Sequence, residues 1–285
     1  MINIIKSALS TSSHKMSVIS NNIANSGTNG FKRSEATFED IFYFKPCYES
    51  GANNVNMKWN GTSYDNVPAK KVNVGQGSRV TSNRVSHNPA PVKQSGVSSD
   101  LAVNGHGMFV LAPAPDRLTS DELMYTRNGS FQLDENGYLT SHDGMFVLAA
   151  NNTGSTTVLE PIQVDYFKSG IPLSEFTVSP EGYVMTSYGK GSLEAGKRIG
   201  LASFDNPQGL TQMGEGKFGQ TVEASLYGIF GPGEGNAGKV LPGHIEVSNV
   251  DIVKELVALI QAQQSFAAAS KAIQTDNNMI ARMLN

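Results

Sequence analysis

Apolar residues repeat at helical heptad spacing at both ends of the chain, and this pattern constrains the fold more than any other feature. At the N-terminal end the steps alternate between three and four residues and are interrupted only by Ser12. The apolar members of this stripe are Ile2, Ile5, Leu9, Met16, Ile19 and Ile23. Residues 25–30 then collect Asn, Ser, Thr and Gly, which favour caps and turns. We therefore expect a helix that ends near this cluster.

The same alternation runs through the C-terminal end over a longer stretch. Ser248, followed three residues later by Asp251, is a candidate helix start. The stripe comprises Ile252, Leu256, Leu259, Gln263, Phe266, Ser270, Ile273, Asn277, Ile280 and Leu284. Its polar members fall seven residues apart, as residues that fix the register of a coiled coil do. The two stripes predict terminal helices that pair as a coiled coil.

The first half of the C-terminal stripe carries a second apolar face. This face consists of Val253, Val257, Ile260 and Ala267. A helix of about 37 residues is about 55 Å long, and one partner helix cannot cover two faces over that length. We expect neighbouring subunits to cover the remaining surface. The alternative is ordinary packing of two helices within one monomer.

The middle of the chain is typical of short strands and turns. The Asn136-Gly137 pair lies between two segments expected to be strands, 125–133 and 138–140, and is a strong hairpin signal. A second hairpin is expected over 176–185. The sequence thus predicts an α+β protein with a central antiparallel β domain. The expected divisions are an N-terminal helix at 1–30, an extended linker or insertion at 31–75, a β-rich domain at 76–243 and a C-terminal helix at 244–285.

Composition excludes several functional classes. The net charge is −3 and charged residues make up only 16% of the chain, so no nucleic-acid partner is expected. No stretch approaches the ~18 apolar residues of a membrane span, and the first residues do not resemble a signal peptide. Residues 191–198 resemble a phosphate-binding loop, but Arg198 replaces the required Ser or Thr. The five histidines are scattered. We therefore expect no enzyme, no metal, no cofactor and no small-molecule substrate.

Several motifs occur in a fixed order between residues 18 and 275. They lie at 18–33 and 38–41, at 100–109, 125–129 and 201–210, and from 246–251 through 272–275. Together they resemble the motifs of flagellar rod and hook proteins, over most of the chain except 45–75. Gln264 and Ala269 depart from the pattern, since this family usually has an Arg and an Asn at those two positions.

The resemblance implies a structural axial subunit of the bacterial flagellum that works by polymerising. In this family the terminal helices form the inner layer of a hollow tube and the β domain faces outward. The implied partners are other copies of the chain, other flagellar rod and hook proteins and the flagellar type III export apparatus, through which the chain leaves without a cleaved leader. The residues expected at the assembly interface are Ile5, Leu9, Met16, Ile19, Asn22, Ile23, Asn25, Phe31, Ile252, Leu256, Leu259, Phe266, Ile273 and Ile280.

The resemblance leaves the rod and the hook as alternative locations. Segment 45–75 has the position of an insertion typical of the distal rod, which favours a torque-transmitting subunit of the periplasmic rod. Residues 201–210 are also compatible with a small extracellular hook protein. A more distant alternative is a secreted binding or adhesive module, which would be a stable monomer with a concave apolar pocket.

Overall fold

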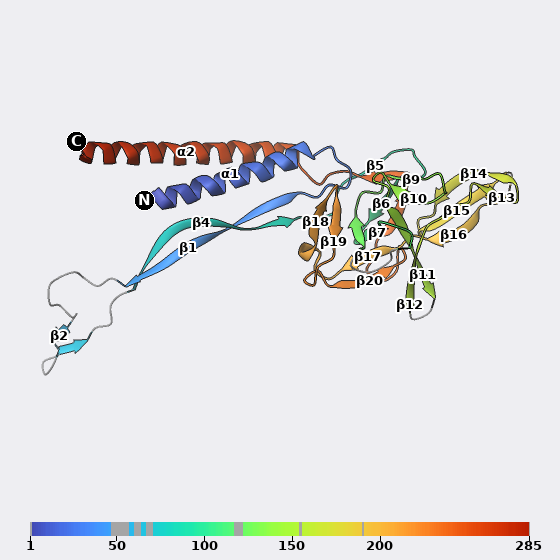
Figure 1. Ribbon diagram of the computed structural model, residues 1–285, viewed down its shortest axis with the longest axis horizontal. Coiled ribbons are helices and arrows are strands. Elements are labelled where there is room, and N and C mark those ends of the chain that lie inside the picture. The colour runs from blue at the N-terminus through green and yellow to red at the C-terminus, as the bar shows by residue number, and fades with distance from the viewer. Residues whose placement is uncertain are drawn as a thin grey trace. The chain divides into compact units, whose positions relative to one another are not determined.

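The computed structural model describes residues 2–46, 57–59, 64–66, 71–116, 122–153, 156–189 and 191–284. It has helices at both ends and a β-rich centre, which confirms the predicted α+β class (Figure 1). The chain divides into two compact units. We name them the terminal unit, residues 1–21, 35–84 and 253–285, and the β unit, residues 22–34 and 85–252.

The terminal unit contains the two long helices, α1 (Ile2–Ala24) and α2 (Ile252–Leu284). The end of α1 at Ala24 agrees with the polar cluster that follows it. The start of α2 is later than expected, because Asp251 and not Ser248 directly precedes its first residue. The Ser248 hydroxyl instead accepts a hydrogen bond of 3.3 Å from the backbone N–H of Val250. Neither helix is apolar enough over its described length to cross a membrane.

Two pairs of strands complete the terminal unit. The long strands β1 (Ser34–Pro46) and β4 (Lys71–Val85) pair in a two-stranded sheet, and β2 (Met57–Trp59) pairs antiparallel with β3 (Tyr64–Asn66). The domain boundary expected at 75/76 therefore falls inside β4. Residues 71–75, which fall in the expected linker, instead form the start of β4, because their backbone pairs with β1. Most of the remainder of 45–75 lies outside the described residues.

Polar contacts place α1 against β4. The Thr11 and Ser78 hydroxyls lie 3.4 Å apart, and the ring Nε2 of His14 lies 2.9 Å from the side-chain oxygen of Asn83. A Cβ atom at Gly77 would lie 2.0 Å from the Ser7 hydroxyl oxygen. The absence of a side chain at Gly77 is therefore what allows the helix to approach the strand this closely.

Antiparallel strands build the β unit, and the largest sheet that the described residues form has ten of them. Its main path runs β18-β19-β8-β7-β11-β10-β9, with β12 on β11 and with β17 between β7 and β20. A four-stranded sheet, β13-β14-β15-β16, extends the unit (Figure 1). The strands are β5 (Val92–Gln94), β6 (Leu101–Asn104), β7 (Met108–Ala112), β8 (Met124–Thr126), β9 (Phe131–Leu133), β10 (Leu139–Ser141), β11 (Phe146–Thr153), β12 (Thr156–Pro161), β13 (Phe167–Lys168), β14 (Ile171–Val178), β15 (Tyr183–Tyr188), β16 (Glu194–Arg198), β17 (Leu201–Phe204), β18 (Thr211–Gly214), β19 (Lys217–Gly219), β20 (Leu226–Phe230), β21 (Lys239–Pro242) and β22 (His244–Glu246), with a 3₁₀ turn, η1, at Pro207–Gly209.

The core lies on both faces of the sheet at β7. Phe109 and Leu111 belong to one buried cluster, whereas Met108, Val110 and Ala112 belong to another. Because successive side chains of a strand point to opposite faces, this alternation means that β7 is covered on both sides. Each of its five residues is at most 4% exposed. The β unit thus has a closed core of its own.

The predicted hairpins are present. Leu133 of β9 pairs with Leu139 of β10 around the Asn136-Gly137 turn, and Val178 of β14 pairs with Val184 of β15. Gly137 has a φ of +77°, a conformation that glycine adopts without the steric cost of a Cβ. Turn chemistry therefore determined these local pairings as the sequence predicts.

Candidate functional site

The predicted interface residues of α1 are mostly covered in the single chain. Ile19 is buried, and Ile5, Leu9, Met16 and Ile23 are half-buried. The apolar stripe of α1 therefore already has neighbours within the chain. Its predicted contact with other subunits stays a prediction.

The predicted stripe of α2 divides into two parts. Leu259, Phe266 and Ile273 are half-buried, whereas Ile252, Leu256 and Ile280 are 42–48% exposed. The covered face also includes Glu255 and Ala262, which are 1% and 2% exposed, at positions that the heptad pattern did not select. The face that the chain covers is therefore rotated relative to the predicted stripe, and Gln263 and Asn277 are exposed rather than enclosed.

The first turns of α2 present a second apolar face to solvent. We call it the α2 apolar face, and it consists of Ile252, Val253, Leu256, Val257 and Ile260. These side chains are 46–70% exposed. Single exposed apolar residues are ordinary, but five within nine residues form a contiguous patch of the kind that marks a protein interface. Val253, Val257 and Ile260 belong to the second apolar face expected from the sequence, whereas Ile252 and Leu256 belong to the predicted coiled-coil stripe.

The three remaining predicted interface residues lie in the last turn of α1 or after it and make contacts within the β unit. Asn22 is 1% exposed, and its side chain donates to the Ser34 carbonyl at 2.8 Å and accepts from the Ser34 N–H at 3.0 Å. Asn25 accepts a hydrogen bond from Thr28. The carbonyl of half-buried Phe31 accepts one from the backbone of Asn249. Each of the three therefore has an internal structural role in the single chain.

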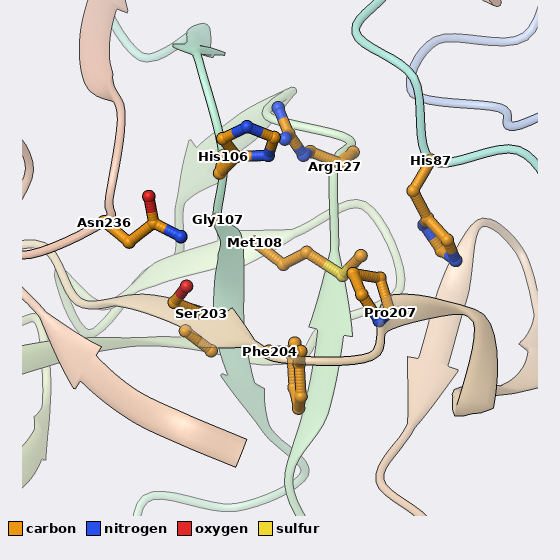
Figure 2. A pocket seen from close by; sticks show the side chains of 10 residues that line it. His87, His106, Gly107, Met108, Arg127, Ser203, Phe204, Pro207 and Asn236 are labelled. Atoms are coloured by element: carbon orange, nitrogen blue, oxygen red, sulfur yellow. The ribbon is translucent and has the colours of Figure 1, made fainter. Parts of the chain in front are cut away.

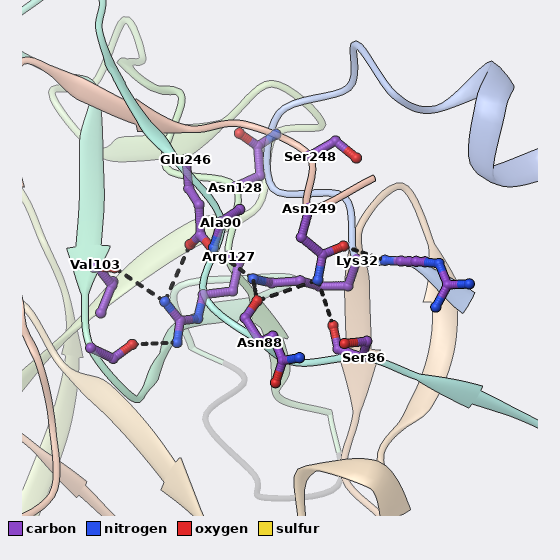
Figure 3. Close-up of polar contacts among 12 residues, drawn as sticks. Lys32, Ser86, Asn88, Ala90, Val103, Arg127, Asn128, Glu246, Ser248 and Asn249 are labelled. Carbon is purple, nitrogen blue, oxygen red and sulfur yellow. Dashed lines mark hydrogen bonds and ion pairs between the residues drawn. The ribbon is translucent and has the colours of Figure 1, made fainter. Parts of the chain in front are cut away.

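A buried ion cluster lies close to these residues and centres on Glu246 (Figure 3). One carboxylate oxygen of Glu246 lies 2.6 Å from Lys32 Nζ, and the other lies 3.2 Å from a terminal nitrogen of Arg127. The backbone N–H of Ala90 adds a bond of 3.1 Å to the first oxygen. The three charged side chains are at most 5% exposed. We call these contacts, with those of Asn249, the Glu246 network.

Two cations share one carboxylate in this cluster, so a positive charge remains. Backbone carbonyls accept further hydrogen bonds from the two cations. Lys32 donates to the Asn88 carbonyl at 2.8 Å, and Arg127 donates to the carbonyls of Val103 and Gly105 at 3.2 and 2.6 Å. Burial lowers the pKa of Lys32 and of Arg127, and Glu246 opposes both shifts. A buried ion group of this kind is tolerated when further hydrogen bonds compensate the loss of water, and these three backbone carbonyls supply them here.

Beside this cluster, His87 lines a cavity of about 50 Å³ with His106, Arg127 and Ser203 (Figure 2). Its ring packs edge-on against Phe218, with 5.2 Å between the ring centres. Neither buried ring nitrogen has a hydrogen-bond partner among the described residues. Burial, together with the positive charges of Lys32 and Arg127, lowers the pKa of His87 to about 4. The imidazole is therefore neutral at pH 7.

The described residues include no group of three or more His, Cys, Asp or Glu side chains that could hold a metal ion. The three charged side chains of the Glu246 network contact one another and backbone carbonyls of the same unit, so the arrangement suits a structural role. Sequence reasoning missed this network. Lys32, Arg127 and Glu246 lie inside the motifs named above, but no spacing rule joins residues that are 95 and 119 positions apart.

Comparison with known proteins gives consistent matches. Family models match three parts of the chain: a flagella basal body rod protein model at 2–32, a flagellar hook protein FlgE/F/G D1 domain model at 102–187 and a flagellar basal body rod FlgEFG C-terminal model at 241–285. The flagellar basal-body rod protein FlgG of Buchnera aphidicola subsp. Acyrthosiphon pisum is 30% identical over 98% of this chain and 96% of that protein. FlgG of Bacillus subtilis is 30% identical over 95% of this chain and 92% of that protein. The flagellar hook protein FlgE of Caulobacter vibrioides is 28% identical over 52% of this chain but only 23% of its own length.

Proposed function

The chain belongs to the family of flagellar basal-body rod and hook proteins and is a structural axial subunit of the flagellum, and we propose that it polymerises into the distal rod. The family is one of structural proteins, and we assign no catalytic activity to this chain. The proposed partners are other copies of the chain and other rod and hook proteins. Export through the flagellum's own apparatus is part of the proposal and is supported by family membership alone.

The α2 apolar face is the observation that carries the polymerisation proposal. Its five side chains are about half exposed in the single chain, and a subunit of a polymer has neighbours available to cover them. Contacts between different surfaces of identical subunits generate open helical filaments when the rotation does not close a ring. We propose that α1 and α2 form the inner layer of such a tube, with coiled-coil contacts between helices, and that the β unit faces outward.

The rod is favoured over the hook by the extent of the matches. The chain spans nearly the whole length of the rod relatives, whereas it matches less than a quarter of the hook relative. In the rod the proposed task is to transmit motor torque along a straight shaft. The hook, a flexible joint outside the cell, is the second candidate because half of the chain still aligns with a hook protein.

The test is cryo-electron microscopy of basal bodies that carry a small tag between Ser169 and Gly170. These residues form the turn between β13 and β14, both are exposed, and a side chain added at Gly170 would meet no atom within 4 Å. Tag density along the straight shaft between the membranes is the expected result. Density on the curved segment outside the cell would establish the hook instead, and density on neither would contradict an axial role.

A further inference from the structure

The chain passes between its two units four times, at 21/22, 34/35, 84/85 and 252/253. The first residue of the β unit, Asn22, forms a pair of hydrogen bonds with Ser34, the residue at which the chain leaves that unit. Both residues are buried, at 1% and 8% exposed. The first and second passages are therefore held together inside the β unit.

Asn249 joins the second, third and fourth passages. Its side-chain oxygen accepts a hydrogen bond of 2.6 Å from the backbone N–H of Arg33, and its side-chain nitrogen donates to the Ser86 carbonyl at 2.8 Å. The backbone N–H of Ser86 in turn donates to the Arg33 carbonyl at 2.8 Å. Figure 3 shows Asn249 between these segments. Asn249 itself lies three residues before α2 begins at Ile252.

The ion cluster fastens the same segments to the sheet. Lys32, from the segment after α1, and Glu246, from the end of β22, are in contact with each other and with the backbone at Asn88 and Ala90. Arg127, which directly follows β8, binds Glu246 and the carbonyls of Val103 and Gly105. Together with the Asn22–Ser34 pair, these buried and half-buried polar contacts reach all four passages.

We propose that the Glu246 network, together with the Asn22–Ser34 pair, fixes the spacing of the four chain segments that lead from the β unit to the terminal unit, so that a load on one segment is shared by all four. This inference rests on the proposed function, because a subunit that transmits torque must carry load through these segments. Directional hydrogen bonds suit the task better than apolar contacts do, because apolar packing tolerates rearrangement as long as its volume is preserved. Lys32, Glu246 and Asn249 are positioning residues in this account.

The discriminating variant is Lys32→Met in the full chain. It removes the excess buried charge and leaves Glu246 paired one-to-one with Arg127, so it creates no unpaired buried ion. The matched control is Lys168→Met, which removes another lysine that is paired with a glutamate in the β unit but is 52% exposed. The measurement is amide hydrogen exchange on the unassembled subunit, resolved over 22–34, 86–90 and 246–250.

We expect exchange in these three segments to be roughly tenfold faster or more in Lys32→Met, while exchange in β7 and β11 stays at the wild-type rate. The control should match the wild type throughout. Unchanged exchange in the three segments would overturn the inference. Because hydrogen exchange is measured on the monomer, that result would leave the proposed rod function intact. Failure of the wild-type chain to appear in basal bodies would instead overturn the proposed function and would say nothing about these contacts.

A second variant covers the case in which Lys32→Met does not fold. Asn249→Ala removes the side-chain contacts to Arg33 and Ser86 without changing any charge. The same local acceleration is expected at 31–34 and 86–88. If Asn249→Ala folds and exchanges like the wild type, the network does not hold these segments and the inference is wrong.

Discussion

Five consecutive residues of β7, 108–112, are at most 4% exposed, whereas the five residues of the α2 apolar face are 46–70% exposed. Both sets consist of apolar side chains from the same chain. The β7 residues are enclosed in two buried clusters, but the described residues around the start of α2 leave the other set largely uncovered. The difference supports the proposal that α2 gains a neighbour on assembly, whereas the core of the β unit is already enclosed in the single chain.

The largest expected effect comes from a charge on the α2 apolar face. Leu256→Asp should block polymerisation while the β unit stays folded, because an unpaired carboxylate buried between subunits costs several kcal/mol at each contact. The measurement is sedimentation of assembled protein, combined with near-UV circular dichroism of the monomer. Ile19→Asp is a poorer probe, since Ile19 is already buried in the single chain.

The matched control for this variant is Ser265→Asp. Ser265 is exposed on the same helix, but the 3.6-residue period places it on a different face from Leu256. It should assemble as the wild type does. Normal assembly of Leu256→Asp would remove the main support for the proposed role of the α2 apolar face.

A smaller effect is expected from pH and belongs to the β unit. His87 has a folded-state pKa of about 4 against about 6.5 when unfolded, so the unfolded chain takes up the proton first as the pH falls. The stability that neutral His87 gives the folded state is fully present above about pH 6.5. It is lost as the pH falls from about 6.5 to about 4. From pH 7 to pH 5 the free energy of unfolding should drop by about 2 kcal/mol more in the wild type than in His87→Phe. Urea denaturation at the two pH values measures this, and equal drops would contradict it.

The smallest expected effect concerns a turn of the β unit. Ser169 and Gly170 both have positive φ, at +54° and +79°, as in a two-residue hairpin turn that favours Asn-Gly. Ser169→Asn should raise the free energy of unfolding by roughly 0.5 kcal/mol, whereas Ser169→Val should lower it by about 1 kcal/mol. Thermal unfolding of the two variants checks the signs. A higher free energy of unfolding in Ser169→Val would show that the positive φ at this position does not disfavour a β-branched side chain.

Short-range chemistry explains which parts of the fold the sequence predicted. The Asn136-Gly137 and 176–185 hairpins depend on a few adjacent residues, and the polar cluster after Ala24 ends α1 locally. The face of α2 that the chain covers was harder to predict, because its first half has apolar residues on two sides and periodicity does not say which side is covered. The Glu246 network could not be predicted, since its members come from distant segments and only the fold brings them together.

The most direct test of the contrast between the two units is amide hydrogen exchange of the full chain, compared between the monomer and the assembled polymer. We expect residues 252–260 to exchange rapidly in the monomer and to become strongly protected in the polymer, while β7 and β11 are equally protected in both. Equal protection of 252–260 in the two states would contradict the account, because it would mean that the α2 apolar face gains no neighbour on assembly.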